Sequence, residues 1–266
     1  MVLNIALICL TVILGLCVGS FLNVVIYRLP NNMSLIRPAS HCPNCDYKLK
    51  WYDNIPLLSY IILKGKCRNC KQKISIKYPL VEFANMALWF LALMMHTNVI
   101  FPNNSTNWVL FAVACLTFSV LICVFMCDLE NMEIPDELQI CLLILGIVSF
   151  LAQSMDASSR VYGFLLGGGF FALFAGLFYL IRKKEGLGFG DIKLMAVLGL
   201  LLGFQNTIIT IILSSVSGAI TLLILALKNK GEKGKEYPFA TFIVPSAIIA
   251  WFVGDIVSNW YLSLFA

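Results

Sequence analysis

Two aspartates that are far apart in the sequence each stand where an apolar run meets a polar segment. Asp128 directly follows the apolar run that ends at Cys127, and Asp191 follows the segment 188–190 (GFG) and opens the next run. An ionisable side chain at such a position costs free energy in a bilayer, which makes it a candidate functional residue. Two neighbouring carboxyl groups do not both ionise easily, so one keeps its proton. Such a pair can activate water and polarise a peptide carbonyl, which is acid–base hydrolysis without a metal.

Structural roles are the alternative for these aspartates. Aspartate is a favoured helix N-cap residue, and Asp191 opens an apolar run. Asp128 alternatively keeps its carboxylate in water at the membrane interface. Asp136, Glu130 and Glu133 are rival candidates for the first carboxylate. A solvated acidic turn accounts for these three better than catalysis does.

A second group of residues has the spacing of a metal site. Two CxxC pairs, separated by residues 46–66, are formed by Cys42, Cys45, Cys67 and Cys70. Each pair can offer two sulfurs to one ion, so the four predict a tetrahedral four-thiolate zinc site. Disulfides or free thiols are the alternatives, and a reducing compartment disfavours the disulfides. A site with four cysteine ligands has no open position, which indicates a structural rather than a catalytic metal.

The composition places these groups in a membrane protein. Hydrophobic residues make up 60% of the 266 residues and charged residues only 12%, and the mean hydropathy is +0.88. Soluble domains are usually about 45–50% apolar, so this chain has too little polar surface to cover a soluble globule. The net charge of +5 does not indicate nucleic acid, because the basic residues lie in short stretches between apolar runs.

The apolar runs predict an all-α polytopic membrane protein with about eight transmembrane helices, because a spanning helix needs roughly 20 apolar residues. The expected spans are 4–27, 79–96, 107–127, 138–153, 161–181, 191–204, 206–227 and 238–262. The pattern of apolar residues defines the hairpin around Gly203, between the spans 191–204 and 206–227, least well.

Lysine and arginine residues predict the orientation of these spans. They gather in segments 29–77, 182–190 and 228–236, whereas segment 97–106 is uncharged and segment 154–160 holds one charge of each sign. The basic segments are therefore expected in the cytoplasm, together with the cysteine loop and both aspartates. The N-terminus and the C-terminus are expected on the outer side.

Several motifs, in order and over residues 15–245, resemble the prepilin peptidases, also called type IV leader peptidases. The matching segments are 19–30 (GSFLNVVIYRLP), 37–45 (RPASHCPNC), 54–59 (NIPLLS), 65–67 (GKC), 78–82 (YPLVE), Asp128 with 134–136 (IPD), 188–193 (GFGDIK, the GxGD motif) and 237–240 (YPFA). The chain departs from the family at Ala240-Thr241, where Gly-Pro is usual.

The resemblance implies a membrane aspartic protease, with Asp128 and Asp191 as its catalytic pair. Its substrates would be type IV prepilins, or the pseudopilins of type II secretion, whose basic leader is removed at the cytoplasmic face of a bacterial inner membrane. The implied division is a first transmembrane helix at 1–28, a cytoplasmic zinc loop at 29–78 and the protease helices at 79–266.

The cysteine loop implies a second activity, because family members that carry it usually methylate the new N-terminus with S-adenosylmethionine. No glycine-rich nucleotide signature marks the cofactor site. Resemblance and polarity alone suggest Glu82, Gly65 and Asn23 as its contacts; their structural alternatives are a helix-end carboxylate, a turn and a buried polar contact. A protease without methyl transfer, and a transporter that uses aspartates as relay sites, are the alternative functions.

Overall fold

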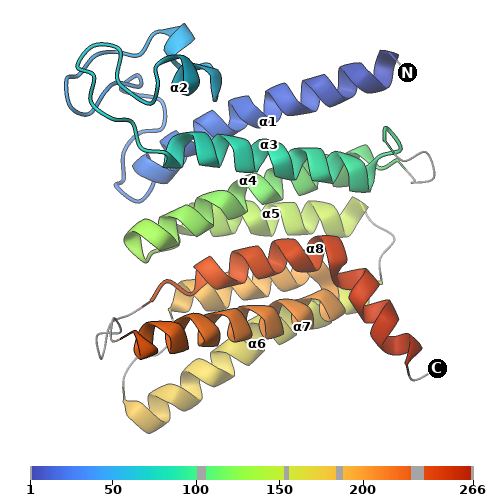
Figure 1. Cartoon of the computed structure of the whole chain (residues 1–266). Helices are drawn as coiled ribbons and strands as arrows, with labels where there is room; N and C mark the ends of the chain where they lie inside the picture. The colour runs from blue at the N-terminus through green and yellow to red at the C-terminus, as the bar shows by residue number, and fades with distance from the viewer. Residues whose placement is uncertain (1, 101–105, 153–155, 184–187, 229–236, 265–266) are drawn as a thin grey trace. The chain divides into compact units, whose positions relative to one another are not determined.

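The computed structural model describes residues 2–100, 106–152, 156–183, 188–228 and 237–264, in which the regular structure is helical (Figure 1). Two isolated β-bridges occur in the cysteine loop. The chain forms two compact units, Met1–Cys123 and Val124–Ala266. The helices are α1 (Val2–Arg28), the 3-10 helix η1 (Trp51–Asp53), α2 (Leu58–Ile62), α3 (Lys77–His96), α4 (Trp108–Asn131), α5 (Asp136–Ala152), α6 (Ala157–Arg182), α7 (Phe189–Leu227) and α8 (Ala240–Ser263).

The expected all-α membrane fold is confirmed. Six of the helices, α1, α3, α4, α6, α7 and α8, are long and apolar enough to cross a membrane. α5 is apolar but has only 17 residues. α7 is interrupted at Gly203 (φ 77°, ψ 175°), so its 39 residues form two arms. The eight expected spans therefore correspond to α1, α3, α4, α5, α6, the two arms of α7 and α8.

Helices of the first unit are joined by a buried polar network. Asn85 on α3 donates to the Gly15 carbonyl on α1 (2.7 Å) and accepts from Ser119 Oγ on α4 (2.7 Å). Trp89 Nε1 donates to the same Ser119 oxygen (3.0 Å). Polar side chains in a bilayer must find partners within the protein, and such bonds hold membrane helices together. The network therefore fixes which faces of α1, α3 and α4 meet.

In the second unit, α6 packs closely against the first arm of α7. A Cβ at Gly199 on α7 would overlap the backbone of Gly163 on α6, and a Cβ at Gly167 would overlap the Met195 carbonyl. Small residues let the backbones of membrane helices approach closely. In a bilayer, the van der Waals contacts made there are a main source of helix association, because no water is displaced. This contact positions the first arm of α7, which carries Asp191 in its first turn.

Two backbone groups at the break at Gly203 find partners on α6. Phe204 N donates to Ser159 Oγ (3.1 Å), and the Leu200 carbonyl accepts from the Arg160 guanidinium (3.3 Å). In an unbroken α-helix, this amide and this carbonyl would pair with each other. Arg160 is fully buried and also donates to Ser149 Oγ on α5 (3.0 Å). The first turn of α6 therefore stabilises the interruption of α7.

Contacts with α8 show that the second arm of α7 runs antiparallel to it. Gly218 lies against Phe239 and Phe242 at the start of α8, whereas Asn206 lies against Gly254 near its end. The second arm thus leads from the far end of α8 back to its start, and the two arms make a helical hairpin (Figure 1).

Much of the two later basic segments lies outside the described residues. These parts include Lys184, Lys230, Lys233 and Lys235. The orientation of the spans therefore stays a prediction.

Candidate active site and metal centre

The four predicted metal ligands lie together in the first unit. The Sγ atoms of Cys42, Cys45, Cys67 and Cys70 all lie within 4.8 Å of one another. The Cys42–Cys70 and Cys45–Cys67 sulfur pairs are each 3.9 Å apart, which is too far for a disulfide and close enough for one shared ion. These four cysteines could therefore hold a metal ion.

Each CxxC pair lies in a loop of the same conformation. In the first loop Cys42 N donates to the Tyr47 carbonyl (3.0 Å). In the second loop Cys67 N donates to the Gln72 carbonyl (2.8 Å), and this donor and acceptor each lie 25 residues after their counterparts in the first loop. The bridges His41–Lys48 and Lys66–Lys73 repeat at the same offset. Residues 41–48 and 66–73 are thus two copies of one knuckle, an internal repeat that the equal cysteine spacing signals.

The knuckles promote thiolate formation unevenly. A backbone hydrogen bond from Gln72 lowers the pKa of the Cys70 thiol to about 6. Although the Asn44 amide favours the Cys42 thiolate, burial and the neighbouring sulfurs raise the pKa of Cys42 to about 11. Without a cation, the cluster resists a second negative charge; a bound metal ion would remove that penalty and deprotonate the remaining thiols.

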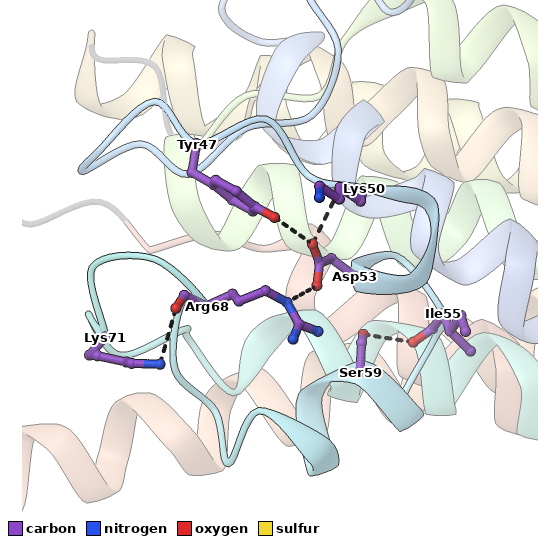
Figure 2. Close-up of polar contacts among 7 residues, drawn as sticks. All are labelled: Tyr47, Lys50, Asp53, Ile55, Ser59, Arg68 and Lys71. Carbon is purple, nitrogen blue, oxygen red and sulfur yellow. Dashed lines mark hydrogen bonds and ion pairs between the residues drawn. The ribbon is translucent and has the colours of Figure 1, made fainter.

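Asp53 joins the two knuckles (Figure 2). Its side chain is fully buried and accepts from Arg68 Nε in the second knuckle (2.7 Å). It also accepts from the Tyr47 hydroxyl in the first knuckle (3.4 Å) and from Lys50 N just after that knuckle (3.3 Å). Burial alone would raise the pKa of Asp53, but the hydrogen bonds from Arg68 and Lys50 lower it below its ordinary value. An ionised Asp53 therefore holds the two halves of the metal site together.

We expect Asp53→Asn to release bound metal about tenfold faster than the parent chain, because one charge-assisted hydrogen bond of about 1.5 kcal/mol is lost. Metal release from the full-length protein to a chromogenic chelator measures this rate. Because its folded-state pKa is lowered, the contribution of Asp53 is present at neutral pH and is lost as pH falls through that lowered value. Asp46→Asn, which changes an exposed carboxylate of the same loop, is the matched control. Equal release rates for the two variants would contradict the role of Asp53.

The three residues suggested as cofactor contacts each have contacts with the protein itself in the first unit. Glu82 on α3 is buried and accepts from Leu57 N (2.8 Å). Asn23 on α1 donates to the carbonyls of Gly19 and Tyr78. Gly65 has a positive φ of 65°, and a Cβ there would lie 2.9 Å from the Tyr60 hydroxyl. None of the contacts described for these three residues joins two of them directly.

Both predicted aspartates lie in the second unit and are buried. Asp128 in the last turn of α4 is 5% exposed, and Asp191 in the first turn of α7 is 8% exposed. They are close enough for their negative charges to repel each other. Asp128 Oδ2 accepts from Thr241 N at the start of α8 (3.1 Å), whereas Asp191 Oδ1 is buried with no hydrogen-bond partner in the described residues. Two carboxyl groups so placed can share one proton.

The start of α7 is held by contacts that the sequence analysis did not predict. Lys193 forms a salt bridge with Asp136 (2.8 Å), and its ammonium lies 4.8 Å from the centre of the Phe189 ring. Gln139 on α5 donates to the Gly190 carbonyl (3.4 Å). These contacts attach the turn that carries Asp191 to the first turn of α5. Their signal in the sequence is weak, because Lys193 and Gln139 are single polar residues in or beside apolar runs.

The rival carboxylates have other surroundings. The Asp136 side chain is 68% exposed and pairs with Lys193. Glu130 and Glu133 are exposed. Neither exposure nor a salt bridge to lysine favours a shared proton, so Asp128 is the stronger candidate for the partner of Asp191.

Comparison with known families gives two matches, one after the other along the chain. A bacterial peptidase A24 N-terminal domain matches residues 13–97, and the type IV leader peptidase family matches residues 115–223. Proteins named prepilin leader peptidase/N-methyltransferase are similar over nearly the whole chain. The one from Stutzerimonas stutzeri is 35% identical over 94% of this chain and 92% of its own length. That from Pseudomonas aeruginosa is 35% identical (95% and 92%), and that from Legionella pneumophila 34% (93% and 92%). No solved structure gives a significant match.

Proposed function

Since the chain belongs to the type IV leader peptidase family, we propose that Asp128 and Asp191 are the catalytic pair with which it processes its substrates. The enzyme is a prepilin leader peptidase and N-methyltransferase, as its relatives are named. The observation that carries the catalytic assignment is the pair of buried carboxyl groups at two helix ends of one unit, close enough to repel each other.

The substrates we propose are the precursors of type IV pilins or pseudopilins. Such a precursor would place its hydrophobic helix in the bilayer and its short basic leader in the cytoplasm. The scissile bond then lies at the membrane surface, where α4 ends and α7 begins. One carboxylate takes a proton from water as the water attacks the peptide carbonyl, while the protonated carboxyl donates to the carbonyl oxygen.

Zinc is the metal we propose for the four-cysteine site. A tetrahedral ion with sulfur ligands at about 2.3 Å places the sulfurs about 3.8 Å apart. The two 3.9 Å sulfur separations agree with that spacing. Four thiolates fill the coordination sphere, so the metal would hold the loop in shape and not take part in the reaction.

S-adenosylmethionine, when bound, would supply the methyl group for the new N-terminal amine. Glu82, Gly65 and Asn23 are the contacts we propose for it, on resemblance and polarity alone. The polar groups of Glu82 and Asn23 already have partners within the protein: Glu82 accepts from Leu57 N, and Asn23 donates to the carbonyls of Gly19 and Tyr78. These hydrogen bonds would compete with bonds to the cofactor.

We propose a bacterial inner membrane as the location, with the cysteine loop and both aspartates on the cytoplasmic side. The basic segment 29–77 supports this orientation, because lysine and arginine favour the cytoplasmic face. The proposed functional division is a first membrane helix at 1–28, the methyltransferase-associated zinc loop at 29–78 and the protease helices at 79–266.

Intact mass spectrometry of a pilin-like precursor tests the proposal. The precursor is incubated with the full-length protein in liposomes, with and without S-adenosylmethionine. We expect the substrate to lose the mass of its leader and, only with the cofactor, to gain that of one methyl substitution. Leader loss without methylation would leave a protease alone. An unchanged precursor, with ion flux across the liposome, would replace the proposal with a transporter.

A further inference from the structure

The two carboxyl groups of the proposed pair have unequal surroundings. Asp128 Oδ2 accepts from Thr241 N (3.1 Å), and the Ala240 amide makes a further backbone hydrogen bond to this carboxyl. Both amides belong to the first turn of α8, which begins at Ala240. Asp191 has a backbone hydrogen bond from Gly188, but its Oδ1 is buried without a partner in the described residues.

This difference decides which group carries the negative charge. Amides in the first turn of a helix have no partner within that helix, and they favour an anion. Hydrogen bonds to an ionised carboxylate stabilise it, whereas a buried oxygen without a donor favours the protonated form. On the proposed catalytic pair, we propose that Asp128 is the ionised member and general base, that Asp191 is the protonated member and general acid, and that the Thr241 amide sets this division.

The charged groups around Asp128 agree with the assignment. Asp191 faces it from α7, and its negative charge would add repulsion if both groups were ionised. Glu130 lies on α4 itself and is exposed. Lys193, two residues beyond Asp191, is paired with Asp136 on α5. From α8 the described contacts with the Asp128 carboxyl are the amides of Ala240 and Thr241.

The reaction balances with these roles. Asp128 takes a proton from water as the water oxygen bonds to the scissile carbonyl carbon, and Asp191 gives its proton to the carbonyl oxygen. When the C–N bond breaks, Asp128 passes its proton to the leaving amine. Asp191 recovers a proton from one hydroxyl of the tetrahedral intermediate. One water is consumed, and both carboxyl groups return to their starting forms.

Position 241 offers a selective way to remove the donor. Proline has no N–H, and helices accept it in the first turn. Thr241→Pro therefore deletes one of the two amides that bond to Asp128 and keeps the carboxyl groups of both aspartates. Thr241→Ala retains the amide and loses only the side-chain bond from Thr241 Oγ1 to the Pro238 carbonyl, so it is the matched control.

Leader cleavage by the full-length protein, measured against pH, tests the assignment. In Thr241→Pro we expect the fall of activity at low pH to shift to higher pH by about one unit, because the ionised Asp128 loses a donor. The fall at high pH, which reports the Asp191 proton, should stay in place. In Thr241→Ala both limbs should coincide with those of the parent chain. An unshifted acidic limb in Thr241→Pro, or an equal shift in Thr241→Ala, would overturn the assignment.

Two further measurements keep this test decisive. If Thr241→Pro does not insert into the membrane, the α-hydroxy analogue of threonine at position 241 replaces the N–H by an oxygen with little change of shape, and the same shift is expected. Asp128→Asn and Asp191→Asn are assayed in parallel. If both are inactive and the acidic limb does not move, the catalytic pair stands and the division of roles fails. If either retains normal cleavage, the catalytic pair itself fails.

Discussion

Asp191→Asn is expected to lower the rate of leader cleavage by about 10²–10⁴-fold, the usual contribution of a positioned general acid or base. Asparagine has nearly the same size as aspartate, so the turn at the start of α7 should keep its contacts with Gln139 and Asp136. The amide cannot deliver a proton to the substrate carbonyl, so the chemical step is lost and not the fold. Asp128→Asn should cause a loss of the same order, because it removes the group that takes a proton from water.

Cleavage of a saturating pilin-like precursor, followed by mass spectrometry, measures both losses. Glu133→Gln is the matched control, because it neutralises an exposed carboxylate that lies between the two proposed catalytic residues in the sequence. This control should cleave at close to the parent rate. Normal cleavage by Asp128→Asn together with a large loss in Glu133→Gln would mean that the wrong carboxylate has been assigned to the pair.

Cys67→Ser is expected to abolish metal binding and to unfold the cysteine loop. Serine replaces one of four thiolates, and structural zinc sites of this kind contribute about 10–16 kcal/mol to folding. A loop of this size has too little apolar core to fold without such a contribution. Cys67 is also the most buried of the four ligands, so the new hydroxyl has little access to water.

Three readouts follow the effect of Cys67→Ser. Metal content should fall to background, limited proteolysis should cut within residues 29–78, and methyl transfer should be lost. Leader cleavage should persist at a measurable rate, because both aspartates lie in the other compact unit. Cys9→Ala, which changes an exposed cysteine of α1, should leave all of these unchanged. A Cys67→Ser protein that retains a full complement of metal would contradict the site.

The helices and the two candidate sites could be predicted from the sequence because each depends on a local pattern. The length of the apolar runs determines which segments can span a bilayer. The spacing of Cys42, Cys45, Cys67 and Cys70 is imposed by the need to surround one ion. The position of Asp128 and Asp191 at the ends of apolar runs predicts that both lie at the membrane boundary.

The contacts that support these sites were not predictable, because they join residues that lie far apart or that have no signature. Arg160 falls in an expected loop, yet it is fully buried and bonds to the Leu200 carbonyl at the break in α7. Asp53 is one of two aspartates in a loop rich in lysine, and its role depends on Arg68 reaching it from the second knuckle. The donor from Thr241 is a backbone amide, which every residue except proline possesses.

The cleavage rate of the double variant Asp128→Asn/Asp191→Asn, compared with the two single variants, tests most directly whether the carboxyl groups act as one unit. Residues that act together give losses that do not multiply. We therefore expect the double variant to cleave no more than a few-fold more slowly than the slower single variant. If the single losses are about 10²–10⁴-fold, independent residues would give a loss of about 10⁴–10⁸-fold in the double variant. Multiplied losses of that size would contradict the paired mechanism.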